Sequence, residues 1–136
     1  MLKKWLIRSF VAVSVLVVAF FVSCSVTDES LTDEGIVAKI VGSWKVAETV
    51  GTTSTHYSVS VTSSGSVNVT ISNFYNVDLS VKATVSEGSL IIPEQIVGGY
   101  TIKGTGIFSN SYSTITLNYT TDDGSGKESV TDILTR

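Results

Sequence analysis

The chain contains few of the residues that bind metals, form disulfides or interrupt strands. Its 136 residues include one Cys, one His, one Pro and one Met. A single cysteine excludes an internal disulfide and a multi-cysteine zinc site, and a single histidine excludes any site that needs two imidazoles. Charged residues make up only 15% of the sequence, but hydrophobic residues make up 43%, so the chain is not a disordered polar tail. The length suits one ordinary domain.

The net charge of −3 hides an uneven distribution. Three of the nine basic residues precede Cys24, whereas all twelve acidic residues follow it. Such an acidic segment after Cys24 repels the phosphates of nucleic acids and anionic membrane surfaces. We therefore expect no nucleic-acid partner.

The N-terminal segment has the pattern of a secretory signal peptide. It begins with Lys3, Lys4 and Arg8, and residues 10–22 are then apolar except for one serine. An apolar run of this length rises about 20 Å as a helix, which is short of a hydrocarbon core of about 30 Å. We expect a cleaved lipoprotein signal peptide over residues 1–23. A permanent anchor helix is the alternative, but it has to be extended back past Arg8.

Cys24 follows this segment directly and is the predicted point of lipid attachment. The sequence Phe-Val-Ser-Cys at 21–24 resembles a bacterial lipobox, although Phe21 replaces the usual leucine. A lone thiol in an exported protein has no disulfide partner, so it is either free or modified. Two or more acyl chains hold a protein on a membrane, so we expect a membrane as partner through an N-terminal lipid anchor. A free buried cysteine is the alternative.

An acidic tether is expected over residues 24–35. The acids that soon follow Cys24 resemble the surface-export signal of Bacteroidota lipoproteins, and a solvated spacer explains the same residues. The resemblance implies a lipid-anchored protein of the bacterial outer membrane, exposed at the cell surface.

A brief helix opens the folded domain, which we expect to span residues 36–136. Apolar residues fall at helical spacing between 36 and 41, Ser30 or Thr32 provides the N-cap, and Gly42 ends the helix. After Gly42, apolar and polar residues alternate with a period of two, which is typical of strands with one buried face. The eight predicted strands cover 44–46, 57–61, 67–71, 79–85, 90–92, 100–106, 114–119 and 130–134.

Short polar turns separate these strands, so strands adjacent in sequence are expected to pair as hairpins. Pro93 is expected to stop the fifth strand, because proline cannot donate to a ladder. No long crossover connection is visible, which favours an all-β, eight-stranded antiparallel up-and-down barrel. Closure of the barrel removes both exposed edges. A two-sheet β-sandwich is the alternative.

Gly42 and Trp44 form a G-x-W sequence at the start of the first strand, and Arg136 ends the last strand. This arrangement resembles that of lipocalin-like (calycin-like) barrels. The domain as a whole resembles that of small Bacteroidota lipoproteins, with matching stretches at 41–44, 71–74, 90–95, 103–106 and 115–119. The resemblance implies that Arg136 packs on Trp44 and plugs one end of the barrel, a contact worth ~0.5–2 kcal/mol. It implies no particular ligand.

Tyr57, Tyr100 and Tyr119 are the candidate ligand-binding residues, with Tyr112 as a further candidate. Packing in the core or at the rim is the alternative for each of them. An eight-stranded barrel is just wide enough for side chains to fill it or for one small ligand. Small residues such as Gly104 leave room for a ligand if they point inward, or they allow a close approach of strands.

No constellation of residues indicates catalysis. His56 is the only imidazole base and has no nucleophile motif beside it, so we expect a solvated position for it rather than a hydrolase site. The sequence at 122–126 lacks the closing Glu of a calcium loop and predicts a hairpin tip. We expect no cofactor, no metal and no enzymatic activity.

Two functions fit the sequence. In one, a lipid-anchored barrel binds a small apolar or amphipathic ligand at its open mouth. In the other, a filled barrel serves as a structural or accessory lipoprotein through contacts with another envelope protein. A cavity favours the first function, and a packed lumen with an apolar outer patch favours the second.

Overall fold

The computed structural model of the chain describes residues 31–136. The predicted signal peptide over 1–23, the lipid-attachment residue Cys24 and most of the acidic tether lie outside the described residues. No helix within residues 31–136 is long and apolar enough to cross a membrane.

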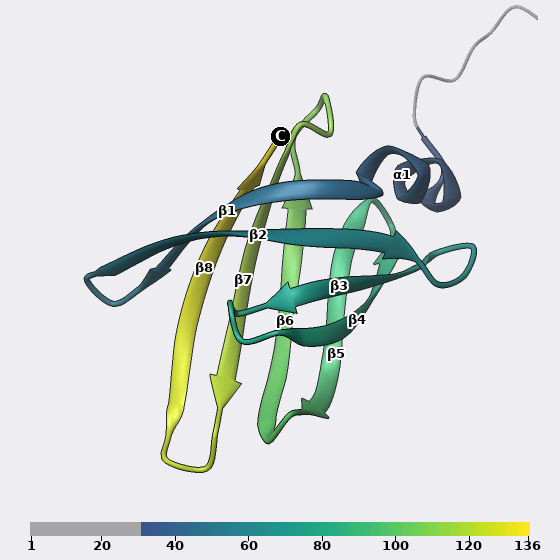
Figure 1. The fold of residues 1–136 in the computed structure, drawn as a ribbon. Helices are drawn as coiled ribbons and strands as arrows, with labels where there is room; N and C mark the ends of the chain where they lie inside the picture. Colours follow the sequence, from purple (N-terminus) through teal and green to yellow (C-terminus); the bar gives the residue numbers. More distant parts are fainter. Residues whose placement is uncertain (1–30) are drawn as a thin grey trace, which may run out of the picture. The chain divides into compact units, whose positions relative to one another are not determined.

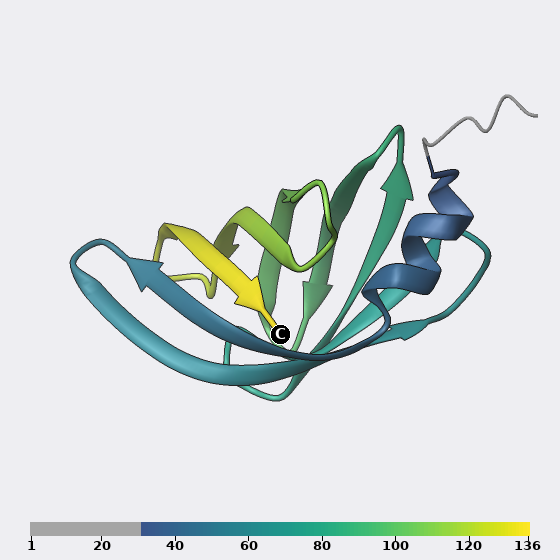
Figure 2. The same ribbon diagram turned by 90° about the horizontal axis from the view of Figure 1, so that it is seen from above.

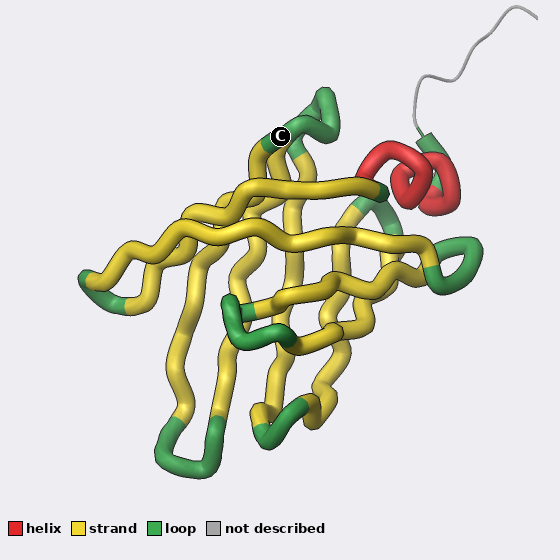
Figure 3. The backbone as a smooth tube through the Cα atoms, viewed as in Figure 1, coloured by secondary structure: helices red, strands yellow, loops and turns green. Residues whose placement is uncertain are grey.

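One short helix precedes eight strands (Figure 1). The elements are α1 (Asp33–Ile40), β1 (Gly42–Val50), β2 (Thr53–Ser63), β3 (Asn68–Phe74), β4 (Leu79–Ser86), β5 (Ser89–Val97), β6 (Tyr100–Phe108), β7 (Thr114–Asp122) and β8 (Lys127–Thr135). Short connections join consecutive strands, as the tube in Figure 3 shows.

The strands form a closed antiparallel barrel in the order β1 to β8. Each strand pairs with its neighbour in sequence, and β8 returns to pair with β1 through the register Lys45–Thr135 to Val50–Val130. Viewed from above in Figure 2, the strands curve around a common interior. The predicted eight-stranded up-and-down barrel is therefore confirmed, and the β-sandwich alternative is wrong.

The helix α1 is tied to one end of the barrel. Thr32 caps it by accepting a hydrogen bond from the Gly35 N–H at 3.2 Å. The Asp33 carboxylate accepts hydrogen bonds from the Glu87 and Gly88 N–H groups in the β4–β5 turn. The helix ends at Ile40, and Gly42 belongs to β1 with a φ of 134° that disfavours residues with a side chain.

Apolar side chains on the inner faces of all eight strands fill most of the barrel. The strictly alternating burial of β4, from Leu79 to Ser86, illustrates the pattern. Trp44 and Phe74 are the largest of the fully buried side chains. The buried residues form one continuous core that also includes Ile36, Val37 and Ile40 of α1.

The expectation that Pro93 stops the fifth strand is wrong. β5 continues to Val97 and accommodates Pro93 in an irregularity between Ile92 and Gln95, where the register with β6 shifts. The Gln95 side chain then replaces part of the missing ladder to β4. Its amide donates to the Lys82 carbonyl at 2.8 Å and accepts from the Lys82 N–H at 3.0 Å.

Gly104 does not leave room in the lumen. It lies opposite Tyr119, and a Cβ at this position would lie 2.3 Å from the Tyr119 Cβ and 2.5 Å from the Asn118 carbonyl oxygen. At Gly106, a Cβ would lie 2.7 Å from the Leu117 side chain. Of the two roles considered for Gly104, the structure therefore shows close approach of neighbouring strands.

Candidate functional site

Trp44 and Arg136 close the end of the barrel that carries α1. The Trp44 Nε1 donates to the Ile40 carbonyl at 2.8 Å, and the Arg136 guanidinium carbon lies 4.2 Å from the Trp44 ring centroid. Arg136 also donates to the carbonyls of Val41, at 3.1 Å, and Lys39. The positive charge of Arg136 thus lies beside the free carbonyls at the C-terminal end of α1. The helix dipole also favours a cation at this end. Trp44 is only 1% exposed, so its side chain is buried at this end of the barrel.

The three candidate tyrosines lie together at the opposite end of the barrel. Tyr57 and Tyr119 are on the inner faces of β2 and β7, and Tyr100 lies at the rim, at the start of β6. Tyr112 lies elsewhere. It is in the β6–β7 connection near the C-terminus, with its ring centroid 5.8 Å from that of Phe108. The structure therefore groups three of the four candidate tyrosines and separates the fourth.

Tyr57 and Tyr119 contact a pair of buried carboxylates. Glu48 of β1 and Asp132 of β8 are directly opposite each other across the barrel closure and are only 6% and 2% exposed. The Tyr57 hydroxyl lies 2.8 Å from Glu48 Oε1 and 3.1 Å from Asp132 Oδ2. The Tyr119 hydroxyl lies 3.0 Å from each of the same two oxygens. We call these four residues the acid–tyrosine cluster.

Burial determines the protonation of this cluster. Desolvation, reinforced by the charge of Glu48, raises the pKa of Asp132 to about 7. Desolvation and the charge of Asp132 also raise the pKa values of Tyr57 and Tyr119 well above their ordinary value. Both hydroxyls therefore keep their protons, and each donates to one carboxylate at a time. Asp132 Oδ1 is buried and has no hydrogen-bond partner among the described residues.

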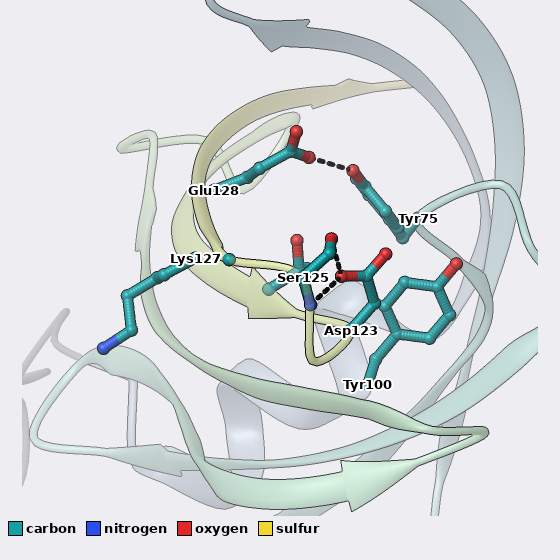
Figure 4. A pocket seen from close by; sticks show the side chains of 8 residues that line it. Tyr75, Tyr100, Asp123, Ser125, Lys127 and Glu128 are labelled. Atoms are coloured by element: carbon teal, nitrogen blue, oxygen red, sulfur yellow. Dashed lines mark hydrogen bonds between the residues drawn. The ribbon is translucent and has the colours of Figure 1, made fainter.

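A cavity of about 210 Å³ opens at the rim above this cluster. Its walls come from the β3–β4 turn, the start of β6 and the β7–β8 hairpin (Figure 4). The lining includes Tyr75, Tyr100, Thr121, Asp123, Lys127 and Glu128. We call it the mouth cavity.

Tyr75 links the mouth cavity to the acid–tyrosine cluster. Its hydroxyl donates to Glu128 Oε2 at 2.8 Å, which Figure 4 shows across the cavity. Its ring meets Tyr100 nearly edge to face, with centroids 5.8 Å apart, and meets Tyr119 in the same way at 6.3 Å. Burial and the Glu128 hydrogen bond raise the pKa of Tyr75, so the hydroxyl is protonated.

The β3–β4 turn places Tyr75 over the mouth at a conformational cost. Tyr75 has a φ of 57°, and Asn73, Asn76 and Asp78 are also in the left-handed region. A bulky residue is rare there, and its strain must be offset by surrounding contacts. Asn73 provides two of them, because its side chain donates to the Ser58 carbonyl at 2.8 Å and accepts from the Asp78 N–H at 3.2 Å.

The β7–β8 connection forms the hairpin tip that the sequence predicts. Asp122 accepts from the Gly124 N–H and Asp123 accepts from the Ser125 N–H, both at 2.9 Å. Within residues 31–136, no three Asp, Glu, His or Cys side chains are grouped closely enough to hold a metal ion. His56 lies exposed on the outer face of β2, opposite Ala47 of β1.

Glu48, Asp132 and Tyr75 are not among the site residues predicted from the sequence. A signal for the two acids exists, because each occupies an inward position in an alternating strand, two residues from Val46 and Val130 respectively. An acid at a core position is an exception that calls for a partner or a function. No comparable signal marks Tyr75, which the sequence places only in a turn.

No family model and no curated protein matches the chain. The solved structures that share its fold include the following two. One is a redesigned beta barrel, 15% identical, with a TM-score of 0.55 over 74% of this chain and 94% of that one. The other is EF1p2_mFAP2b bound to DFHBI, 14% identical, with a TM-score of 0.59 over 77% of this chain and 99% of that one. At such identities the likeness concerns the fold alone.

Proposed function

We propose that the protein is a lipid-anchored lipoprotein of the bacterial outer membrane whose barrel binds a small amphipathic ligand in the mouth cavity. The observation that carries the binding function is the cavity of about 210 Å³ at the end of the barrel that α1 and Trp44 do not close. Two tyrosine rings and several hydrogen-bonding groups line it together, so the cavity offers both apolar and polar contacts to a ligand.

Two further observations support a binding function. Tyr75 adopts a strained backbone conformation at the mouth, and such strain concentrates at functional sites. A barrel of the same fold, EF1p2_mFAP2b, is bound to DFHBI. The cavity is smaller than the range of about 300–1,000 Å³ that is typical of ligand pockets. It therefore takes a small molecule or the head group of a larger one.

The anchored location is proposed from the sequence. A positively charged start, a short apolar run and the lone Cys24 have the arrangement of a bacterial lipoprotein signal. In this proposal the chain is one of the small Bacteroidota lipoproteins with a lipocalin-like domain, which its sequence resembles. The function is binding without catalysis, and no cofactor is needed.

Native mass spectrometry of the protein purified from the envelope of its producing cell tests the proposal. A ligand in the mouth gives a mass excess over the acylated chain that disappears on denaturation. Tyr100→Ala should remove that excess, whereas Tyr112→Ala, which changes a half-buried tyrosine outside the mouth, should retain it. A bare chain mass for the wild-type protein contradicts ligand binding.

A structural or accessory role is the second candidate, and the outer face of the barrel favours it. Ile107 of β6 and Ile133 of β8 are 65% and 45% exposed, and both are aligned with Thr116 of β7. Such neighbouring apolar side chains suit a protein contact. In this case the double variant Ile107→Ser/Ile133→Ser should no longer cross-link to an envelope protein. The control Ile96→Ser changes a more exposed isoleucine and should retain the cross-link.

A further inference from the structure

The open end of the barrel concentrates negative charge. Asp123 and Glu128 line the mouth cavity, and the buried Glu48 and Asp132 lie beneath it on the inner faces of β1 and β8. Lys127 is the one basic residue in the cavity lining, and Figure 4 shows its side chain extending away from the two tyrosine rings. Carboxylates therefore dominate the potential inside the mouth.

The carboxylates of Asp123 and Glu128 at the rim are accessible. Hydrogen bonds from the Ser125 hydroxyl and N–H hold the pKa of Asp123 below its ordinary value. Glu128 accepts one hydrogen bond at Oε2, from the Tyr75 hydroxyl, which leaves lone pairs on the carboxylate for a ligand. Both residues are exposed, so a ligand reaches them from solvent.

The acids beneath the rim lack a cationic partner. The hydrogen bonds that Glu48 and Asp132 receive from described residues come from tyrosine hydroxyls, which carry no charge. Asp132 is 2% exposed, and its Oδ1 is an acceptor without a donor. Buried carboxylates are normally paired with a cation or fully hydrogen-bonded. The barrel interior around Glu48 and Asp132, which do not line the cavity, is thus short of both positive charge and hydrogen-bond donors.

Aromatic rings complete the cavity. Tyr75 and Tyr100 meet at 72°, so their ring planes form two walls at nearly a right angle. Ring faces attract cations, and the attraction strengthens where water is partly excluded. Tyrosine walls combined with carboxylates are suited to an organic ammonium group and poorly suited to an anion.

We propose that the mouth cavity binds the protonated amine of a small amphipathic ligand, with the ammonium group held by Glu128 and Asp123 against the rings of Tyr75 and Tyr100. The inference rests on the ligand-binding function proposed above and specifies its ligand class. The limited volume admits the cationic head group, and the apolar part of the ligand extends outward, beyond the cavity. Ligands that carry a carboxylate head group are repelled by the same residues.

Isothermal titration of the full chain with three probes of similar size tests this inference. The probes are benzylammonium, benzyl alcohol and benzoate, each corrected with a detergent-only blank. We expect benzylammonium to bind about tenfold more tightly than benzyl alcohol, which corresponds to one favourable cation–π and charge contact. Benzoate should bind most weakly.

Two charge-removing variants locate the site. Glu128→Gln and Asp123→Asn should each reduce the preference for benzylammonium about threefold or more, since each removes one charged contact from an exposed site. Both side chains are exposed, so the fold is not at risk. Glu87→Gln, which removes an exposed carboxylate from the β4–β5 turn near α1, should leave the preference unchanged.

The outcomes separate this inference from the broader function. Equal binding of the three probes, or tighter binding of benzyl alcohol or benzoate, overturns the preference for amines but leaves a ligand-binding mouth in place. An unchanged preference in Glu128→Gln and Asp123→Asn also overturns it, because the ammonium then binds elsewhere. Absence of binding by all three probes, together with a bare native mass, overturns both proposals.

Discussion

The hydroxyl oxygen of Tyr119 lies 3.0 Å from both Glu48 Oε1 and Asp132 Oδ2. One proton cannot satisfy two carboxylates at once, and the second hydroxyl, from Tyr57, has the same two neighbours. The barrel therefore closes, between β1 and β8, around a polar cluster with more acceptors than donors. Such a cluster makes the stability of the barrel dependent on pH.

The barrel should lose stability as the pH rises through about 7. Burial holds the pKa of Asp132 at about 7, compared with its ordinary value of 3.8. Between these values the folded state binds a proton that the unfolded state releases, so the free energy of unfolding falls with rising pH. The loss should be on the order of 2–4 kcal/mol. Urea denaturation between pH 4 and pH 8.5 measures it.

Asp132→Asn provides the control for this dependence. The amide is neutral at every pH, so the variant should show a flatter pH profile and should be more stable than the wild type above pH 7. Glu48→Gln removes the neighbouring charge and should shift the loss of wild-type stability to a lower pH. A wild-type stability that rises between pH 5 and pH 8 contradicts the assigned direction of the Asp132 pKa.

Truncation of Trp44 should lower the free energy of unfolding more than truncation of any other aromatic residue at the α1 end. Its ring is 1% exposed, its Nε1 bonds to Ile40 and its face carries the Arg136 guanidinium. Trp44→Ala should cost ~3–5 kcal/mol, and Arg136→Ala should cost ~0.5–2 kcal/mol. Thermal and urea unfolding measure both. A nearly unchanged melting curve for Trp44→Ala would remove its role as a plug.

Two glycines should respond oppositely to the same substitution. A Cβ at Gly104 would lie within 2.7 Å of the Tyr119 backbone and closer still to its Cβ, so Gly104→Ala should destabilise by ~1–3 kcal/mol or more. A Cβ at Gly35 would have its nearest contact at 3.4 Å, inside α1. Gly35→Ala should therefore be neutral or stabilising by up to ~1 kcal/mol. Equal effects in urea unfolding would contradict the close approach at Gly104.

Cys24→Ser tests the lipid anchor. If the thiol carries acyl chains, the variant should lose incorporation of a radioactive fatty acid and should leave the membrane fraction. Ser23→Ala keeps a small residue before the cysteine and should retain both properties. Labelling that persists in Cys24→Ser would refute the lipobox assignment.

The alternation of apolar and polar residues predicted the barrel because each strand buries one face. The contact of Arg136 with Trp44 was implied by the resemblance to lipocalin-like barrels, and the structure places the guanidinium carbon 4.2 Å from the ring centroid. The prediction that Pro93 ends the fifth strand was wrong because the strand accommodates Pro93 in a register irregularity. The Gln95 side chain also donates a hydrogen bond to the Lys82 carbonyl of β4.

The acid–tyrosine cluster could not be predicted from the sequence for a different reason. Glu48 and Asp132 are far apart in the chain, and only the register of β1 on β8 brings them together. The position of Tyr75 depends on left-handed residues in the β3–β4 turn, whose conformation is set by contacts such as the bond from Asn73 to Ser58. Periodicity places Glu48 and Asp132 at inward positions, but it carries no information about their pairing or about the conformation of the β3–β4 turn.

A crystal structure of the protein taken from its own envelope, without exchange of bound molecules, tests the central claim most directly. We predict density for a small molecule in the mouth cavity between Tyr75 and Tyr100, with its polar group within hydrogen-bond distance of Glu128 or Asp123. A mouth that holds only water, in a protein whose native mass equals that of the acylated chain, would contradict ligand binding. The outer isoleucines at 107 and 133 would then be the surface to investigate.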